Sequence, residues 1–274
     1  MRFFLLICFL NLFATTCFAQ DRTLSIYRKT SVAGNLIENT LVQRKFYDST
    51  GNVTRQQDYL DGALAYTTEF RYSENRLLSS TVSKDRRELD RTVFTYGKCG
   101  LPASRTSYVN GKTEIIQVFS FDGNCLLTGM EEQLADGNKW KKGRREIRTH
   151  DAHDSLLTQV MMRGKTDTLQ WIFYNRSADS LIRVIKAKDA DPQEERILYR
   201  QGLPSVKRVL DNNRLVSEEH FLYNEKALLV ERIQSSSSGL IEKETFTYDS
   251  ANRLLTRRQY DAGIRETIYE YIYE

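Results

Sequence analysis

Aromatic residues recur along this chain at a nearly constant interval. Aligned on one position, the recurring residues are Tyr47, Tyr72, Tyr96, Phe121, His150, Tyr174, Tyr199, Tyr223, Tyr248 and Tyr273. These residues, which we call anchors, follow one another at 24 or 25 residues, except for one interval of 29 residues between Phe121 and His150. A fixed period of this length is the sequence signature of a repeat architecture.

Apolar and polar positions alternate in front of each anchor. The residue two before the anchor is apolar in most copies: Phe70, Phe94, Phe119, Ile172, Ile197, Phe221, Phe246 and Tyr271. A spacing of two places both apolar side chains on one face of a strand. Each anchor is therefore predicted to end a half-buried strand, with the Tyr/Phe/Leu face inward. Phe173, Leu198 and Leu222 interrupt the alternation, and we expect that stretch to be covered on both faces.

Two kinds of turn separate the strands of each repeat. The first follows the anchor directly, as in Asp48–Asn52, and is followed by an apolar pair such as Leu254-Leu255. The second lies 12–15 residues after the anchor and includes Asp61-Gly62, Asn110-Gly111, Asp136-Gly137 and Asp261-Ala262-Gly263. Asp-Gly and Asn-Gly pairs between alternating strands are strong hairpin signals. Of the 14 glycines, all but Gly129 and Gly143 fall in or beside a predicted turn.

This register predicts an all-β fold. Each unit of 24–25 residues is a β-hairpin, and about ten units with one further strand at Leu24–Thr30 give 20 strands. We expect a continuous antiparallel meander in a single repeat domain, residues 20–274. Because a flat sheet of this width is unfavourable and strands twist with a fixed hand, the sheet should form a curled or spiral shape.

Residues 1–19 have the composition of a secretory signal peptide. Arg2 precedes the apolar run Phe3–Phe13, and Cys17-Phe18-Ala19 supplies small residues for cleavage before Gln20. The run is too short for a membrane-spanning helix, and lipidation at Cys17 is an alternative. We expect export to the periplasm, the cell surface or the medium, and no membrane span.

The turn motif resembles the YD repeats of the RHS family. The residues that carry the resemblance are Tyr47-Asp48-Ser49-Thr50-Gly51-Asn52-Val53, Phe121-Asp122-Gly123-Asn124 and Tyr248-Asp249-Ser250-Ala251-Asn252-Arg253-Leu254. It extends over residues 40–274 and implies a secreted or surface protein built from a spiral β-sheet shell. Some family members enclose a C-terminal toxin, and we expect none in this chain, which ends in a strand at Glu274. A weaker similarity is to MORN-like hairpin repeats.

Charge and cysteine content narrow the function. The formal net charge is +4, which gives no reason to expect nucleic-acid binding. Cys99 and Cys125 lie in equivalent turns of adjacent units, and a disulfide is typical of an exported protein. Equivalent turns are about 9.6 Å apart, however, while a disulfide needs Cα atoms within about 7 Å, so the pairing stays open.

Two places depart from the repeat and are candidate sites. The overlong unit carries the basic cluster Lys139, Trp140, Lys141, Lys142, Arg144 and Arg145, expected to be an inserted loop that could hold an acidic glycan. His150-Asp151-Ala152-His153-Asp154 could ligate zinc, but the repeat already explains His150 and Asp151. The many Tyr and Phe side chains could line a sugar groove, although their strand period favours packing.

The sequence thus favours a non-catalytic exported repeat protein that serves as a binding or scaffold module at the cell envelope or surface. Its expected partner is a protein or glycan of the cell surface, and no catalytic, cofactor or metal site is predicted. The alternatives are an immunity or antitoxin-type partner of a secreted toxin, and an outer-membrane β-barrel with an apolar outer band.

Overall fold

The computed structural model describes residues 22–137, 139–164, 167–261 and 265–274. The expected signal peptide, residues 1–19, and the turn at Ala262-Gly263 lie outside these residues. Twenty strands make up the described part. The first ten are β1 (Arg22–Val32), β2 (Asn35–Tyr47), β3 (Val53–Leu60), β4 (Ala63–Ser73), β5 (Arg76–Lys84), β6 (Arg87–Tyr96), β7 (Pro102–Val109), β8 (Lys112–Phe121), β9 (Leu127–Asp136) and β10 (Lys139–His150). The others are β11 (Leu156–Arg163), β12 (Asp167–Arg176), β13 (Ser180–Ala187), β14 (Gln193–Arg200), β15 (Leu203–Asp211), β16 (Arg214–Tyr223), β17 (Leu229–Ser236), β18 (Gly239–Tyr248), β19 (Leu254–Asp261) and β20 (Arg265–Tyr273).

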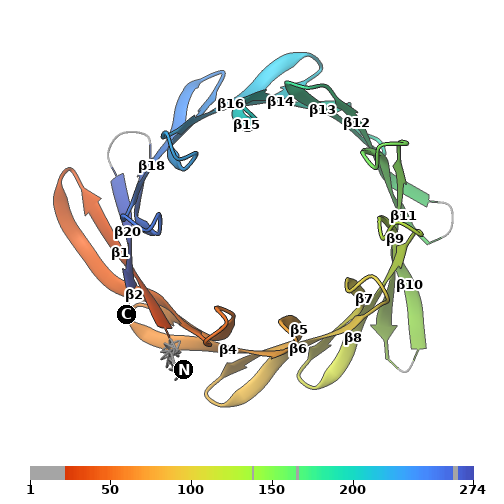
Figure 1. Cartoon of the computed structure of the whole chain (residues 1–274), viewed down its shortest axis with the longest axis horizontal. Coiled ribbons are helices and arrows are strands. Elements are labelled where there is room, and N and C mark those ends of the chain that lie inside the picture. The colour runs from red at the N-terminus through yellow and green to blue at the C-terminus, as the bar shows by residue number, and fades with distance from the viewer. Residues whose placement is uncertain (1–21, 138, 165–166, 262–264) are drawn as a thin grey trace, which may run out of the picture.

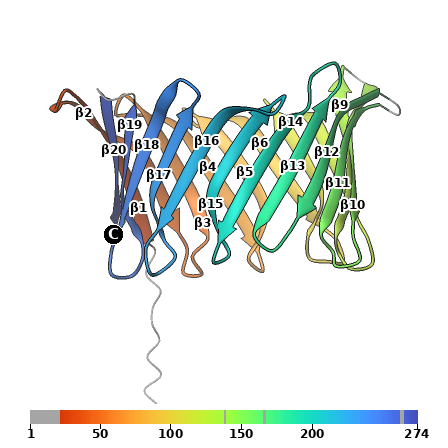
Figure 2. The same cartoon turned by 90° about the horizontal axis from the view of Figure 1, so that it is seen from above.

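The strands form one closed antiparallel barrel. Each strand pairs with the next along the chain, and β1 also pairs with β20 from Leu24↔Tyr273 to Val32↔Arg265. The barrel is a ring when viewed end on, and its strands are tilted when viewed from the side (Figures 1 and 2). The 20 strands and the hairpin order agree with the prediction. In the part of the chain that the structure describes, no helix is long and apolar enough to cross a bilayer.

The expected open, curled or spiral sheet is wrong. Closure has a physical reason, since an open meander leaves the backbone groups of β1 and β20 without partners, and closing the sheet removes both edges. Beyond the strand pairs, Thr23 N–H donates to the Glu274 carbonyl at 3.0 Å, and Glu274 N–H donates to the Thr23 carbonyl at 2.9 Å. The first and last strands therefore supply hydrogen-bond partners for each other's edges.

A β-bulge lies at most anchors and adds curvature. The ladder register shifts by one residue just before Tyr47, Tyr72, Tyr96, Phe121, His150, Tyr199, Tyr223 and Tyr248. Tyr174 and Tyr273 are the exceptions, since their ladders with β13 and β1 continue without a shift. Each bulge increases the local twist and bends its strand. The repeated bulges therefore help to bend the sheet until its edges meet.

The anchors point into the barrel. Thr23 exchanges both backbone hydrogen bonds with Glu274, so its N–H and carbonyl groups point toward β20. The strand order in Figures 1 and 2 shows on which side of β1 the strand β20 lies. For an L-residue this fixes the direction of the side chain, which points outward at Thr23 and inward at the next residue, Leu24. Leu24 shares its face with the anchors through the ladder pair Leu24↔Tyr273. The buried residues agree with this assignment: Leu24, Thr30, Glu132, Ile172 and Glu244 are on the anchor face, and Ser25 is the exception.

The described residues of the barrel form no packed core. Among the described hydrophobic residues only Leu24 and Ile172 are buried, at 7% and 8% exposure. Inward aromatic side chains such as Phe246 are half-buried, so solvent reaches the inner face. The expected double cover around Phe173 and Leu222 is wrong, since these outward side chains are 41% and 58% exposed. Stability therefore depends on the hydrogen-bonded ladders and on contacts between side chains of neighbouring strands.

Candidate functional site

The turns after the anchors form one rim of the barrel, and their first residue holds each turn. In five of them this residue is Asp48, Asp122, Asp151, Asn224 or Asp249, whose Oδ1 accepts the backbone N–H groups two and four residues later at 2.8–3.0 Å. The Thr50 hydroxyl lowers the pKa of Asp48, and the backbone N–H groups of Ser155 and Arg253 lower those of Asp151 and Asp249. The aspartate of the motif therefore serves the turn.

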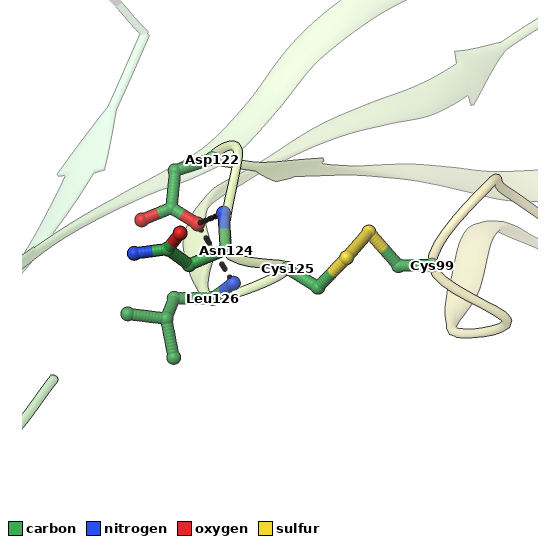
Figure 3. Close-up of a disulfide and its surroundings, with 5 residues drawn as sticks. All are labelled: Cys99, Asp122, Asn124, Cys125 and Leu126. Carbon is green, nitrogen blue, oxygen red and sulfur yellow. Dashed lines mark hydrogen bonds between the residues drawn. A yellow bond between two sulfur atoms is a disulfide. The ribbon is translucent and has the colours of Figure 1, made fainter.

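A disulfide between Cys99 and Cys125 links two adjacent turns of this rim (Figure 3). Each turn has five residues, Gly97–Leu101 and Asp122–Leu126, and the cysteines occupy its third and fourth positions. The offset brings their Cα atoms to 5.6 Å, closer than the strand spacing alone suggests. Cys125 has a φ of 63°, at the position where Gly51 and Gly100 stand in other turns.

The histidine pair follows the repeat. His150 ends β10, and Asp151 N–H donates to the carbonyl of Ser155 at 2.9 Å to close the next turn. Asp151 itself accepts the N–H of His153. Over the described ranges, no group of three metal-capable side chains comes together. The structure gives the zinc hypothesis no support.

The basic cluster is not an inserted loop. Lys139–His150 is β10, which extends the hairpin with β9, so the extra residues lengthen two strands. Three cations face carboxylates of the same hairpin: Lys141 and Asp136 are 2.5 Å apart, Arg145 and Glu131 3.3 Å, and Arg144 and Glu132 3.7 Å. Trp140 is 47% exposed. A binding role for this hairpin stays a prediction, but much of its charge is neutralised locally.

A glycine bulge on β10 accommodates a buried carboxylate. Glu132 is 6% exposed, and its Oε2 accepts a hydrogen bond from Gln117 at 3.1 Å. A Cβ on Gly143 would lie 2.8 Å from the Glu132 Oε1 atom. Gly143 therefore allows the strand to pass this carboxylate, which explains one of the two glycines outside the predicted turns.

A ladder of alternating charge crosses seven strands of the inner face. It runs Arg183, Glu195, Lys207, Glu219, Arg232, Glu244 and Arg257, from β13 to β19. Arg232 lies 2.7 Å from Glu244, which is only 3% exposed and also accepts a hydrogen bond from Arg257 at 2.6 Å. Burial alone lowers the pKa of the Arg257 guanidinium, but Glu244 outweighs burial and the pKa lies above its ordinary value. Sequence reasoning missed this ladder, although the glutamates four residues before Tyr199, Tyr223 and Tyr248 signal it.

A groove with a volume of about 940 Å³ lies on the outer face, over β4, β5 and β6. Its floor is formed by Ser79, Thr81 and Ser83, which are small side chains of β5. The ladders place Glu69 opposite Thr81, and Thr81 opposite Arg91. Small residues on the middle strand thus lie between longer charged residues on its neighbours. We call this feature the outer groove. Sequence reasoning missed it, although alternating hydroxyl residues on one strand are a readable signal.

A family model described as "Uncharacterised protein" matches residues 30–125. No curated protein matches the chain. These comparisons do not confirm the YD-repeat resemblance.

Solved structures give distant similarities. One is a complex of TcdB2, TccC3 and Cdc42, with 14% identity and a TM-score of 0.40 over 86% of this chain, which spans 14% of the length of that protein. Another is a porin-like protein from Bacteroides uniformis, with 11% identity and a TM-score of 0.40, covering 93% of this chain and 96% of the other. A LolA superfamily protein from Nitrosomonas europaea has 10% identity and a TM-score of 0.24, with 93% and 85% covered. Similarities at this level carry no argument about function.

Proposed function

We propose that the chain is a non-catalytic exported protein that acts as a binding or scaffold module at the cell envelope or surface. One observation carries this proposal: the polar side chains that recur in the repeat make hydrogen bonds and ion pairs within the fold. The turn aspartates accept backbone N–H groups, and inner carboxylates such as Glu244 bind guanidinium groups. What the ring offers to other molecules is surface, on two solvent-accessible faces.

Two features support export. The leader-like composition of residues 1–19 is the first. The disulfide between Cys99 and Cys125 is the second, because disulfides form and persist in oxidising compartments such as the periplasm and the cell exterior.

The outer-membrane alternative is disfavoured by the outer face. Lipid contact requires an uninterrupted apolar band there. The outward residues in mid-strand include Arg91, Arg208 and Lys243, each next to a carboxylate of a neighbouring or the same strand. The alternative role as an immunity or antitoxin-type partner stays a hypothesis. Stoichiometric co-purification of the chain with a toxin would favour that role over the proposed one.

Expression of the whole chain with its own leader in a Gram-negative host tests the proposal. We expect mature protein that begins at Gln20, fractionates outside the cytoplasm, and sediments with isolated cell envelopes. Precursor that remains in the cytoplasm would overturn export. Mature protein that neither sediments with cell envelopes nor is recovered with any extracellular fraction would overturn the binding role.

A further inference from the structure

The outer groove has the dimensions of a binding site for an extended ligand. Its floor follows β5 from Leu78 to Ser83, a distance of about 17 Å at the rise of a β-strand. Its volume of about 940 Å³ lies within the range of ligand sites. Ser79, Thr81 and Ser83 are half-buried although they face outward, because the longer side chains of β4 and β6 rise on either side of them.

Two charges on the β4 wall of the groove are available to a ligand. Glu69 and Arg71 lie on the β4 wall, and neither has an oppositely charged partner within 4.0 Å in the described part of the chain. Glu69 lies opposite Arg55, but that guanidinium is placed over the Phe46 ring, 4.0 Å from its centre. Comparable outward pairs elsewhere are closed, as Lys243 and Glu231 are at 2.7 Å.

Hydrogen-bonding groups also remain available. The Ser83 hydroxyl donates to the Thr67 carbonyl at 3.3 Å, whereas the hydroxyls of Ser79 and Thr81 make no hydrogen bond with the described residues. The Arg91 Nε atom is not available to a ligand, because it is buried and lies 3.6 Å from the Glu88 Oε1 atom. The Arg91 guanidinium lies over the Tyr108 ring of β7, 4.4 Å from the ring centre, so Arg91 lines the groove mainly with the rest of its side chain. The floor and walls thus present hydroxyl, guanidinium and carboxylate groups together.

These groups favour a sugar chain over a peptide. A peptide commonly binds a sheet by adding a strand to a free edge, and the closed barrel has none. The lining carries Glu69 and Asp85 against Arg71 and Arg86, and Glu88 already lies 3.6 Å from Arg91, so its charge is balanced. Carboxylates accept hydrogen bonds from hydroxyl groups, while guanidinium groups donate to them. A row of such groups matches a ligand that is neutral and rich in hydroxyls.

We propose that the outer groove binds a neutral oligosaccharide along β5, between the β4 wall of Glu69 and Arg71 and the β6 wall of Arg91. This inference rests on the proposed function as a binding module and names its ligand class. The ligand lies across the floor hydroxyls, Glu69 accepts from its hydroxyl groups, and Arg71 donates to them.

Calorimetric titration of the mature chain with chitotetraose, cellotetraose and maltotetraose tests the proposal. We expect at least one of the three to bind. Glu69→Gln and Arg71→Gln should each weaken that binding at least fivefold, and Thr81→Trp, which fills the floor, should abolish it. The matched control is Thr245→Trp, because Thr245 also faces outward between a carboxylate and an arginine, Glu231 and Arg258, on a distant strand. The control should bind like the unaltered protein.

Two results would overturn the inference: no binding of any of the three sugars by the unaltered protein, or equal binding by the two tryptophan variants. Circular dichroism and melting curves of each variant separate lost binding from lost folding. If envelope sedimentation persists while all three sugars fail to bind, the groove inference falls and the proposed function stands. If the groove binds sugar but the protein is found only in the cytoplasm, the groove inference stands and the proposed function as an exported protein falls.

Discussion

Glu244 lies between two arginines of neighbouring strands, Arg232 on β17 and Arg257 on β19, and is almost fully shielded from solvent by them. Glu244 is the sixth of the seven residues of the inner ladder of alternating charge. A carboxylate held this way cannot be removed without leaving two guanidinium groups facing each other on a surface that water reaches only in part.

Glu244→Ala should therefore destabilise the barrel by about 2 kcal/mol, less than the 3–5 typical of a broken, fully buried pair, because the arginines retain some solvent. Urea unfolding measures this cost. Glu231→Ala is the matched control, since its pair with Lys243 is on the outer face and more exposed. It should cost under about 1 kcal/mol. Equal costs for the two variants would show that the inner ladder contributes no more than an outer pair.

The turn aspartates predict a loss of stability in acid. The pKa of Asp249 is lowered by backbone N–H groups that it accepts only in the folded protein. Its contribution is complete above the unfolded pKa of about 3.9 and is lost as the pH falls through the lower folded value. Asp249→Asn keeps the acceptor, as Asn224 does naturally, and should flatten the pH dependence of the melting temperature below about pH 4. Asp249→Ala should lower the melting temperature at neutral pH as well.

The disulfide should contribute about 3 kcal/mol, since it closes a loop between residues 26 apart in the sequence. Cys99→Ser with Cys125→Ser measures this by unfolding with denaturant, and alkylation with and without reductant reports the bond itself. Cys125 also has a positive φ. In the Cys99→Ser background, Cys125→Gly should therefore be more stable than Cys125→Ser by about 0.5–1 kcal/mol. The opposite order would contradict the left-handed backbone at this turn.

Gly143→Ala should destabilise the β9–β10 hairpin by about 2 kcal/mol, because the new Cβ meets the buried Glu132 carboxylate. Gly123→Ala is the control, since no atom lies within 4 Å of a Cβ there and its backbone is not in the left-handed region. Chemical denaturation of the two variants compares them. Equal stability would mean that Glu132 moves aside at no cost.

The sequence predicts local structure here better than it predicts global shape. The anchors, such as Tyr248, and the turn residues after them encode strands and hairpins within one repeat, where every partner is close in sequence. Closure depends on the pairing of β1 with β20 and on the sum of many small bends at bulges. No single repeat carries that sum, so the period is compatible with both a spiral and a ring.

The structure of the residues that depart from the repeat is less predictable from the sequence. The basic residues from Lys139 to Arg145 favour an inserted loop by composition, whereas their carboxylate partners on β9 make them a longer hairpin. Gly143 was the available signal, because a glycine outside every predicted turn marks a close approach. The outer groove depends on side chains of three strands, such as Glu69, Thr81 and Arg91, and their relation is visible only once the register is known.

The bonds between Thr23 and Glu274 give the strands a circular order. The β1–β20 seam is one more antiparallel ladder, which joins the first and last strands as the other ladders join consecutive strands. A chain joined across the seam and opened at another hairpin would keep every strand next to the same neighbours. The fold is therefore specified by the circular order of its hairpins.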